Sequence, residues 1–98
     1  MHFVVHALDK PDALPRRLEV VAEHRGYLQT ATTMTIPMSG PLTEDDGETM
    51  KGSFFLIDAP DRATIEAFFA EDPLAKADIW QTLQITAFNL RVNTFVEA

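Results

Sequence analysis

The chain contains no cysteine among its 98 residues. This absence excludes a disulfide framework, a thiolate nucleophile and any zinc or iron–sulfur site built on cysteine. It fits a cytoplasmic protein, which is the location we expect. The N-terminal strand-like segment lacks the basic start of a signal peptide, and charged Asp9 and Lys10 follow it in place of a cleavage site. No apolar run approaches the roughly 20 residues that cross a bilayer.

Basic residues are also scarce. Eight Lys and Arg stand against 15 Asp and Glu, so the formal net charge is −7 at pH 7. Such a chain repels phosphate backbones and anionic membranes, which argues against nucleic acid and membrane partners. Only four Gly and six Pro are present, and 46% of the residues are hydrophobic, which excludes a low-complexity chain. We expect a single folded domain over residues 1–98.

Four short segments carry apolar residues in the patterns typical of strands. They are residues 3–8, 34–39, 51–57 and 81–88. Pro37 removes a hydrogen-bond donor from the second segment, which favours an edge or a bulge there. Residues 39–41 (SGP) are expected to turn, and residues 43–48 to form a charged hairpin tip. Asn93 to Val96 are expected to add a short edge segment.

Two stretches between these strands have helical spacing. The first predicted helix follows an N-cap at Asp12. Its stripe comprises Leu14, Leu18, Val21, Arg25 and Leu28. The second predicted helix is capped by Asp61. Asp72 and Pro73 end it, and Pro73 begins a short helix through Ile79.

The order of elements is β-α-β followed by β-α-β. It predicts an α+β fold of the ferredoxin-like, split βαβ type, with an antiparallel sheet and helices on one face. The strands at residues 3–8 and 51–57 carry apolar residues on both faces. Large apolar side chains on an uncovered sheet face would form an unusual exposed patch. We therefore predict a homodimer whose two sheets pack face to face.

Five sequence motifs follow one another along the chain. They are residues 3–11 (FVVHALDKP), the spacing Arg17-x6-His24-x3-Leu28, residues 39–41 (SGP), residues 51–56 (KGSFFL) and residues 70–77 (AEDPLAKA). In this order they resemble the YciI-like (YCII-related) family of the dimeric α+β barrel proteins, over nearly the whole chain. Three positions differ from the family pattern: Arg25 replaces an apolar residue, Leu74 a Phe, and Asp78 a Gly.

The resemblance implies a pocket under the sheet that holds a small molecule beside a His–Asp pair. Carried over to this sequence, the pair is His24 and Asp72, with Arg17 and the Ser39-Gly40 turn as neighbours. The activities it implies are proton abstraction, isomerisation, and lyase-type or dehydrohalogenase-type loss of a small leaving group. The substrates would be small cyclic or aromatic-derived compounds, and no cofactor is required.

The two paired residues also have structural explanations. An unperturbed histidine has a pKa of about 6.5, so His24 can act as a general acid or base near neutral pH. It can equally be a boundary histidine bonded to a backbone carbonyl. Asp72 precedes a proline, where an aspartate caps the next helix. A carboxylate has enough lone pairs to cap a helix and orient a histidine at once.

The residues expected beside this pair also have both a functional and a structural interpretation. Arg17 can bind a substrate carboxylate through two hydrogen bonds, or lie in solvent paired with Asp61 or Glu66. Tyr27 can donate a hydrogen bond in the pocket, or simply pack. The Ser39-Gly40 turn can offer backbone N–H groups to an anion, although a turn of Gly and Pro needs no such role.

Metal binding is the remaining site chemistry to consider. His2 and His6 share a strand face and could join His24 as ligands, but no acidic residue is spaced to complete such a site. We expect no metal. The leading hypothesis is a small cofactor-independent enzyme. The alternative is a non-catalytic domain that binds a small molecule or acts through its dimer.

Overall fold

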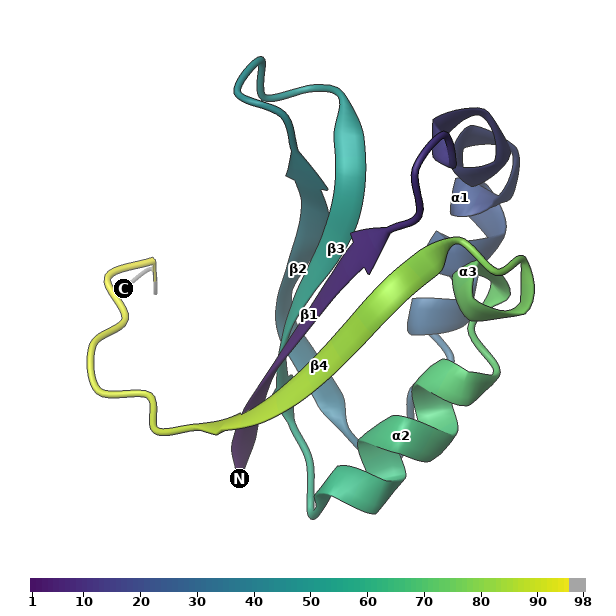
Figure 1. Ribbon diagram of the computed structural model, residues 1–98. Helices are drawn as coiled ribbons and strands as arrows, with labels where there is room; N and C mark the ends of the chain where they lie inside the picture. The colour runs from purple at the N-terminus through teal and green to yellow at the C-terminus, as the bar shows by residue number, and fades with distance from the viewer. Residues whose placement is uncertain (96–98) are drawn as a thin grey trace.

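Four antiparallel strands form one sheet in the computed structural model, which describes residues 1–95. The strands are β1 (His2–Asp9), β2 (Thr35–Thr43), β3 (Met50–Asp58) and β4 (Trp80–Phe88), in the spatial order β2-β3-β1-β4. The helices are α1 (Leu14–Leu28), α2 (Arg62–Ala70) and α3 (Pro73–Lys76). All three lie on one side of the sheet (Figure 1). The predicted α+β, ferredoxin-like fold is therefore confirmed.

Alternation along the strands decides what faces the helices. Val5 of β1 pairs with Phe55 of β3 and Ile85 of β4, so these side chains lie on the same face. They belong to a core between the sheet and α2. Its buried members are Phe3, Val5, Met34, Phe55, Ile57, Ala59, Ile65 and Phe69. Full burial of each large apolar side chain stabilises the fold by about 1.5–3 kcal/mol.

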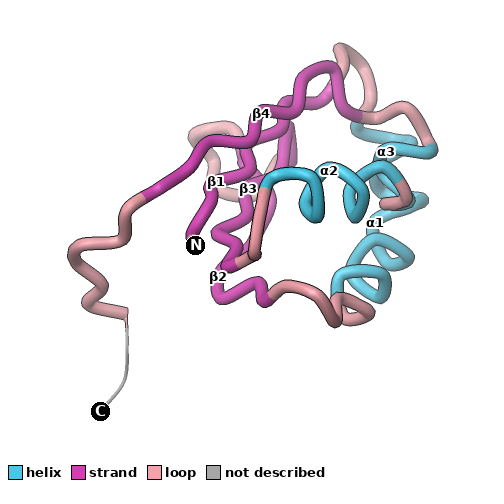
Figure 2. Tube along the Cα trace, turned by 90° about the horizontal axis from the view of Figure 1, so that it is seen from below, coloured by secondary structure: helices cyan, strands magenta, loops and turns pink. Residues whose placement is uncertain are grey.

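The other face of the sheet is apolar as well. In the described part of the chain no helix covers it (Figure 2). Leu8, Met38 and Phe88 are 41%, 37% and 42% exposed there. Residues 89–95 leave β4 on this side (Figure 1), and they form no strand. The edge segment expected from Asn93 is thus absent from residues 93–95, and Val96 lies outside the described residues.

Helix α1 differs from its prediction at two points. Ala13, not Asp12, is the N-cap residue, and it makes no side-chain cap hydrogen bond. Asp12 has φ of 62°, because it belongs to the turn in which Ala13 N–H donates to the Lys10 carbonyl. The buried residues of α1 are Arg17, Val20 and His24, whereas Leu18 is 54% exposed. The helix is rotated from the expected stripe because two polar residues find buried partners.

Strand β2 also differs from its prediction. Residues 39–41 do not turn but continue the strand to Thr43, and Ser39 pairs with Phe55. The hairpin tip lies beyond them, where Gly47 has φ of 73°. Pro37 sits at a register shift between Thr35 and Met38, on an edge strand, as predicted.

The second helical region follows the prediction closely. The side chain of Asp61 accepts a hydrogen bond from Thr64 N–H at 2.8 Å and caps α2. Asp72 separates α2 from α3, which ends at Lys76, three residues earlier than expected. Asp78 has φ of 60°, a conformation that aspartate tolerates better than most residues. None of the helices in residues 1–95 is long and apolar enough to span a bilayer.

Two glycines provide a matched test of this packing. A Cβ on Gly52 would lie 2.4 Å from the Ala7 carbonyl oxygen, whereas a Cβ on Gly26 would meet nothing within 4 Å. We expect Gly52→Ala to destabilise the fold by about 1–3 kcal/mol through backbone displacement. Gly26→Ala, inside α1, should stabilise it by about 0.5–1 kcal/mol. Urea unfolding followed by circular dichroism measures both. A Gly52→Ala protein as stable as the wild type would contradict the close approach of β1 and β3.

Candidate active site

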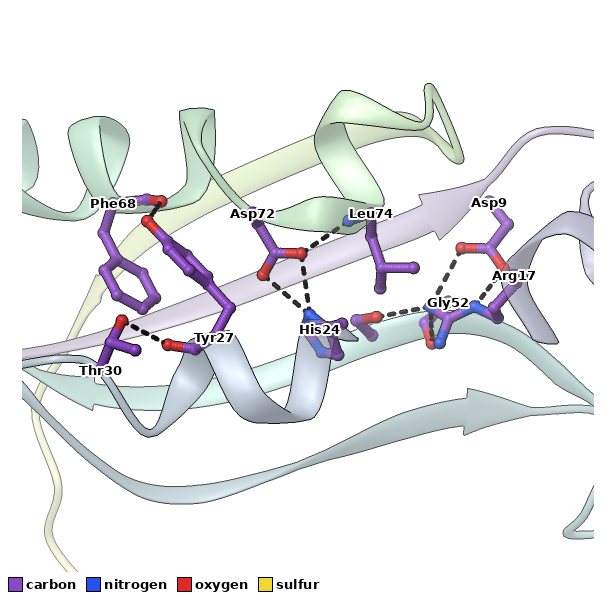
Figure 3. A network of polar contacts seen from close by, with 10 residues as sticks. Asp9, Arg17, His24, Tyr27, Thr30, Gly52, Phe68, Asp72 and Leu74 are labelled. Atoms are coloured by element: carbon purple, nitrogen blue, oxygen red, sulfur yellow. Dashed lines mark hydrogen bonds and ion pairs between the residues drawn. The ribbon is translucent and has the colours of Figure 1, made fainter. Parts of the chain in front are cut away.

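A histidine and an aspartate from distant parts of the chain meet beneath the sheet. His24 Nδ1 lies 2.9 Å from Asp72 Oδ1 and 2.8 Å from Oδ2 (Figure 3). His24 is 6% exposed and Asp72 is fully buried. The structure therefore brings together the two residues that the resemblance singled out. Their contact joins α1 to the start of α3.

Asp72 has two tasks in this arrangement. Its backbone is extended, with φ of −64° and ψ of 135°, as a residue before proline requires. Its Oδ1 accepts a hydrogen bond from Leu74 N–H at 2.8 Å, which caps α3. The same carboxylate meets the imidazole. Capping therefore holds the carboxylate in the orientation that the histidine needs.

The contact also fixes the proton on the imidazole ring. An ionised carboxylate only accepts hydrogen bonds, so His24 Nδ1 must donate to it. In the neutral ring Nε2 is then the acceptor. Nε2 makes no hydrogen bond to residues 1–95 and is not one of the buried, unpaired atoms. Phe55 and Trp80 meet the ring edge-on, with centroids 5.9 and 6.2 Å away. As far as the described residues show, the ring is thus held in place and one nitrogen remains to take a proton.

A cavity of about 250 Å³ opens beside His24, between α1 and the edge of the sheet formed by β2 and β3. Its lining comprises Arg17, Val21, His24, Arg25, Leu28, Ser39, Gly40, Pro41, Met50, Ser53 and Phe55. The volume is at the small end for ligand pockets. It suits a ligand of one ring better than a larger molecule.

Arg17 is buried at one end of this cavity, where its guanidinium group is largely occupied. Nε and Nη2 donate to the two carboxylate oxygens of Asp9 at 2.7 and 3.2 Å. Nη2 also donates to the Gly52 carbonyl and to Ser53 Oγ, at 2.8 and 2.6 Å. Both expectations for Arg17 need correction. It is not solvated beside Asp61 or Glu66, and its paired donors already bind Asp9, so it cannot also grip a substrate carboxylate through two bonds. Only Nη1, 3.9 Å from Met50 Sδ, remains for a ligand.

Sequence reasoning missed Asp9 and Ser53. Asp9 ends β1, and its side chain is 5% exposed. Its position before Lys10 and Pro11 marked a turn and gave no sign of a buried ion pair. Ser53 Oγ accepts from Arg17, so its own hydroxyl proton remains available to donate. Ser53 lines the cavity, which makes it a polar group that a ligand can reach.

Tyr27 lies apart from the cavity that His24 lines. Its hydroxyl donates to the Phe68 carbonyl at 2.6 Å, and its ring stacks on Phe68 with centroids 4.5 Å apart. Figure 3 shows Tyr27, His24 and Arg17 in a row along α1, each reaching a different partner. Tyr27 therefore joins α1 to α2, and the structure does not place it with the pocket residues.

Ser39 and Gly40 do line the cavity, on the wall opposite α1. They do so from within β2 and not from a turn. Ser39 is exposed, and its hydroxyl has no hydrogen-bond partner among the described residues. It is a second hydroxyl that a ligand could contact.

The three histidines do not converge. His2 and His6 alternate with Phe3, Val5 and Ala7 on β1, so they lie on the open face of the sheet. His24 lies under the opposite face. Within residues 1–95, no group of three or more His, Cys, Asp or Glu side chains could hold a metal ion.

Comparison with known proteins places these features in context. A profile of the YCII-related domain matches residues 1–89. No curated protein sequence matches the chain significantly. The structure of 5-chloro-2-hydroxyhydroquinone dehydrochlorinase (TftG) from Burkholderia phenoliruptrix AC1100, in complex with 2,5-dihydroxybenzoquinone, superposes with a TM-score of 0.81. The two chains are 27% identical, over 91% of this chain and 94% of that one. An uncharacterized NIPSNAP domain protein from Burkholderia xenovorans gives a TM-score of 0.48 at 16% identity, over 100% of both chains.

The surroundings of Tyr27 yield a testable prediction. Burial, and then the charges of Asp72 and Glu71, raise the Tyr27 pKa above its ordinary value of 10.0. As the pH rises, Tyr27 then loses its proton in the unfolded chain before it does so in the folded one. The contribution of Tyr27 to the free energy of unfolding is therefore fully present below pH 10 and is lost as the pH rises through the folded-state pKa. Tyr27 is the only tyrosine, so the absorbance of tyrosinate reports it alone. We expect a titration above pH 10 in the folded protein. Glu71→Gln should lower the midpoint, and an unchanged midpoint would contradict the charge effect.

Proposed function

The chain belongs to the YCII-related domain family, and from this premise we propose that it is a small enzyme that uses His24 for proton transfer. The substrate is a small cyclic or aromatic-derived compound, and no cofactor takes part. One observation carries the proposal: Asp72 holds His24 Nδ1, while Nε2 has no partner within residues 1–95 and His24 lines a small cavity. The similar dehydrochlorinase acts, by its name, on a hydroxylated ring, which supports this substrate class.

Loss of a hydrogen halide is the reaction that this arrangement suits best. His24 Nε2 takes a proton from a ring hydroxyl, and Asp72 stabilises the resulting imidazolium. The imidazolium then returns the proton to the ring carbon that carries the halogen. The carbon–halogen bond breaks, the halide leaves with the bonding electrons, and a second hydroxyl loses its proton. The net change is loss of one proton and one halide, so no electrons pass to an external acceptor.

Negative charge develops on the substrate oxygen during this sequence. Donors that are already oriented stabilise such charge more than mobile water does. Ser53 offers its hydroxyl proton, since Arg17 occupies a lone pair of its oxygen. Arg17 Nη1 and the Ser39 hydroxyl are the other donors on the cavity wall. In this proposal Arg17 acts chiefly by orienting Ser53, and Ser39 and Gly40 contact the ligand from the opposite side.

The alternative is a non-catalytic domain that binds a small molecule. In that case the cavity only holds the ligand, and the His24–Asp72 contact only fastens α3 to α1. The two functions differ in turnover and not in binding, so a chemical assay separates them.

We further propose that the chain forms a homodimer through the open face of the sheet. Val4 and Phe54 lie half-buried at its centre, beside the already buried Leu56, with partly exposed Met38 and Phe88 near its margin. A second copy of the same face would bury these side chains and remove an apolar patch that monomers rarely expose. The cavity lies on the other side of the sheet, so this association leaves it open.

The catalytic proposal predicts different effects for two substitutions. With 5-chloro-2-hydroxyhydroquinone as substrate, wild-type protein should release chloride. His24→Gln should lower kcat by about 10²–10⁴-fold, the range for loss of a general acid–base. Asp72→Asn should also lower kcat strongly, because an amide does not fix the imidazole tautomer. Asparagine still caps helices, so stability should fall by less than about 1 kcal/mol.

Asp72→Ala is the matched control, since it should lose the cap as well as the activity. Full turnover by His24→Gln would refute the proposal. Binding of 2,5-dihydroxybenzoquinone by a wild-type protein that releases no chloride would favour the non-catalytic alternative.

The dimer proposal is tested by sedimentation velocity. Wild-type protein should sediment as a dimer at micromolar concentration. Val4→Asp places a charge at the centre of the apolar face and should shift the protein towards monomers, because burial of an unpaired carboxylate is costly. Thr82→Asp, on the same face near the start of β4, is a milder control. A monomeric wild-type protein would refute the dimer.

A further inference from the structure

The cavity beside His24 differs in charge from the rest of the protein. The whole chain has a net charge of −7. Two arginines, Arg17 and Arg25, line the cavity, yet among the described residues its lining includes no Asp or Glu. A site lined by one sign of charge attracts ligands of the opposite sign, and low-dielectric walls strengthen the attraction. The walls here include Val21, Leu28 and Phe55.

The two arginines differ in how far their charge is compensated. Arg17 is fully buried and bonded to both oxygens of Asp9, so the pair is close to neutral. Arg25 follows His24 on α1 and is exposed at the cavity. Among residues 1–95 it has no hydrogen bond and no ion pair within 4.0 Å.

The sequence around Arg25 explains why its guanidinium group has no acidic partner on α1. On a helix the neighbouring side chains are three or four positions away. For Arg25 these are Val21, Ala22, Leu28 and Gln29, and none is acidic. Arg16 on the same helix is a contrast, because Glu19 lies three positions on, with 3.5 Å between Nη1 and Oε2. Arg16 does not line the cavity beside His24.

We propose that Arg25 selects a substrate that carries an ionised group, such as a carboxylate or an enolate oxygen, on its ring. The guanidinium group of Arg25 binds that group at the cavity mouth, while the ring lies between Leu28 and the β2 wall. Bound in this way, the substrate turns another ring position towards His24 Nε2. The inference rests on the proposed function, since it names the substrate class of the same site. It makes Arg25 a binding residue and leaves proton transfer to His24.

Two ligands test it because they share one ring and differ by a single ionised carboxylate. Hydroquinone is neutral at pH 7, and 2,5-dihydroxybenzoate is the same ring with an ionised carboxylate. Isothermal titration calorimetry gives the Kd of each for wild-type protein, Arg25→Gln, Arg25→Lys and Arg16→Gln. Arg16→Gln removes the same charge from the same helix, away from the cavity. Circular dichroism melts verify that each variant is folded.

Wild-type protein should bind 2,5-dihydroxybenzoate more tightly than hydroquinone. Arg25→Gln should weaken binding of the carboxylate by roughly two- to fivefold and change hydroquinone binding little, which is the scale of one accessible ion pair. Arg25→Lys should keep most of the affinity, and Arg16→Gln all of it. Raising the salt concentration should weaken wild-type binding of the carboxylate and leave the Arg25→Gln protein almost unaffected.

Three results would overturn the inference. They are equal wild-type affinity for the two ligands, no detectable binding of 2,5-dihydroxybenzoate, and equal losses for both ligands in Arg25→Gln. His24→Gln separates this inference from the catalytic proposal. If it keeps the preference for the carboxylate and loses turnover, both hold. If it keeps turnover, the catalytic proposal fails whatever Arg25 does.

Discussion

The site depends on one carboxylate that serves two partners. Asp72 accepts the Leu74 N–H at the start of α3 and the Nδ1–H of His24 on α1. Both contacts are buried, where an unpaired charge would cost several kcal/mol. Loss of either hydrogen bond would leave the Asp72 carboxylate less well compensated, and so would also weaken the structural role of the other bond. In this way a local helix cap holds two elements that lie 48 residues apart in sequence.

A second buried pair repeats this logic seven residues earlier on α1. Arg17 reaches Asp9 at the end of β1 and Ser53 on β3, so it joins the helix to two adjacent strands. His24 and Arg17 thus tie the two ends of the cavity wall to the sheet and to α3. Between them, the apolar wall residues, chiefly Val21, are held in position by packing alone.

The order of elements predicted the fold and the family resemblance pointed to the central pair, but neither predicted the details of the wall. Strand alternation and the Asp61 cap follow local rules, and so they were correct. Capping by Asp12 failed because Asp12 itself adopts a left-handed turn conformation, with φ of 62°, and Ala13 becomes the N-cap residue. The stripe through Leu18 failed because tertiary ion pairs buried Arg17 and His24 instead. Asp9 escaped notice because a carboxylate at a strand end is normally solvated. Spacing predicts neighbours on one element, but not partners from another.

Strand β3 contributes to both sides of the molecule. Ser53 and Phe55 face the cavity, and Phe54 and Leu56 face the open side of the sheet. Because side chains alternate, inserting or deleting one residue here would exchange the two sets completely. The hairpin tip before β3 can therefore change in length, whereas an insertion or deletion within Ser53–Leu56 would alter both the cavity wall and the open face of the sheet. Homologous chains should accordingly differ in length around Asp46 and keep a constant spacing through this strand.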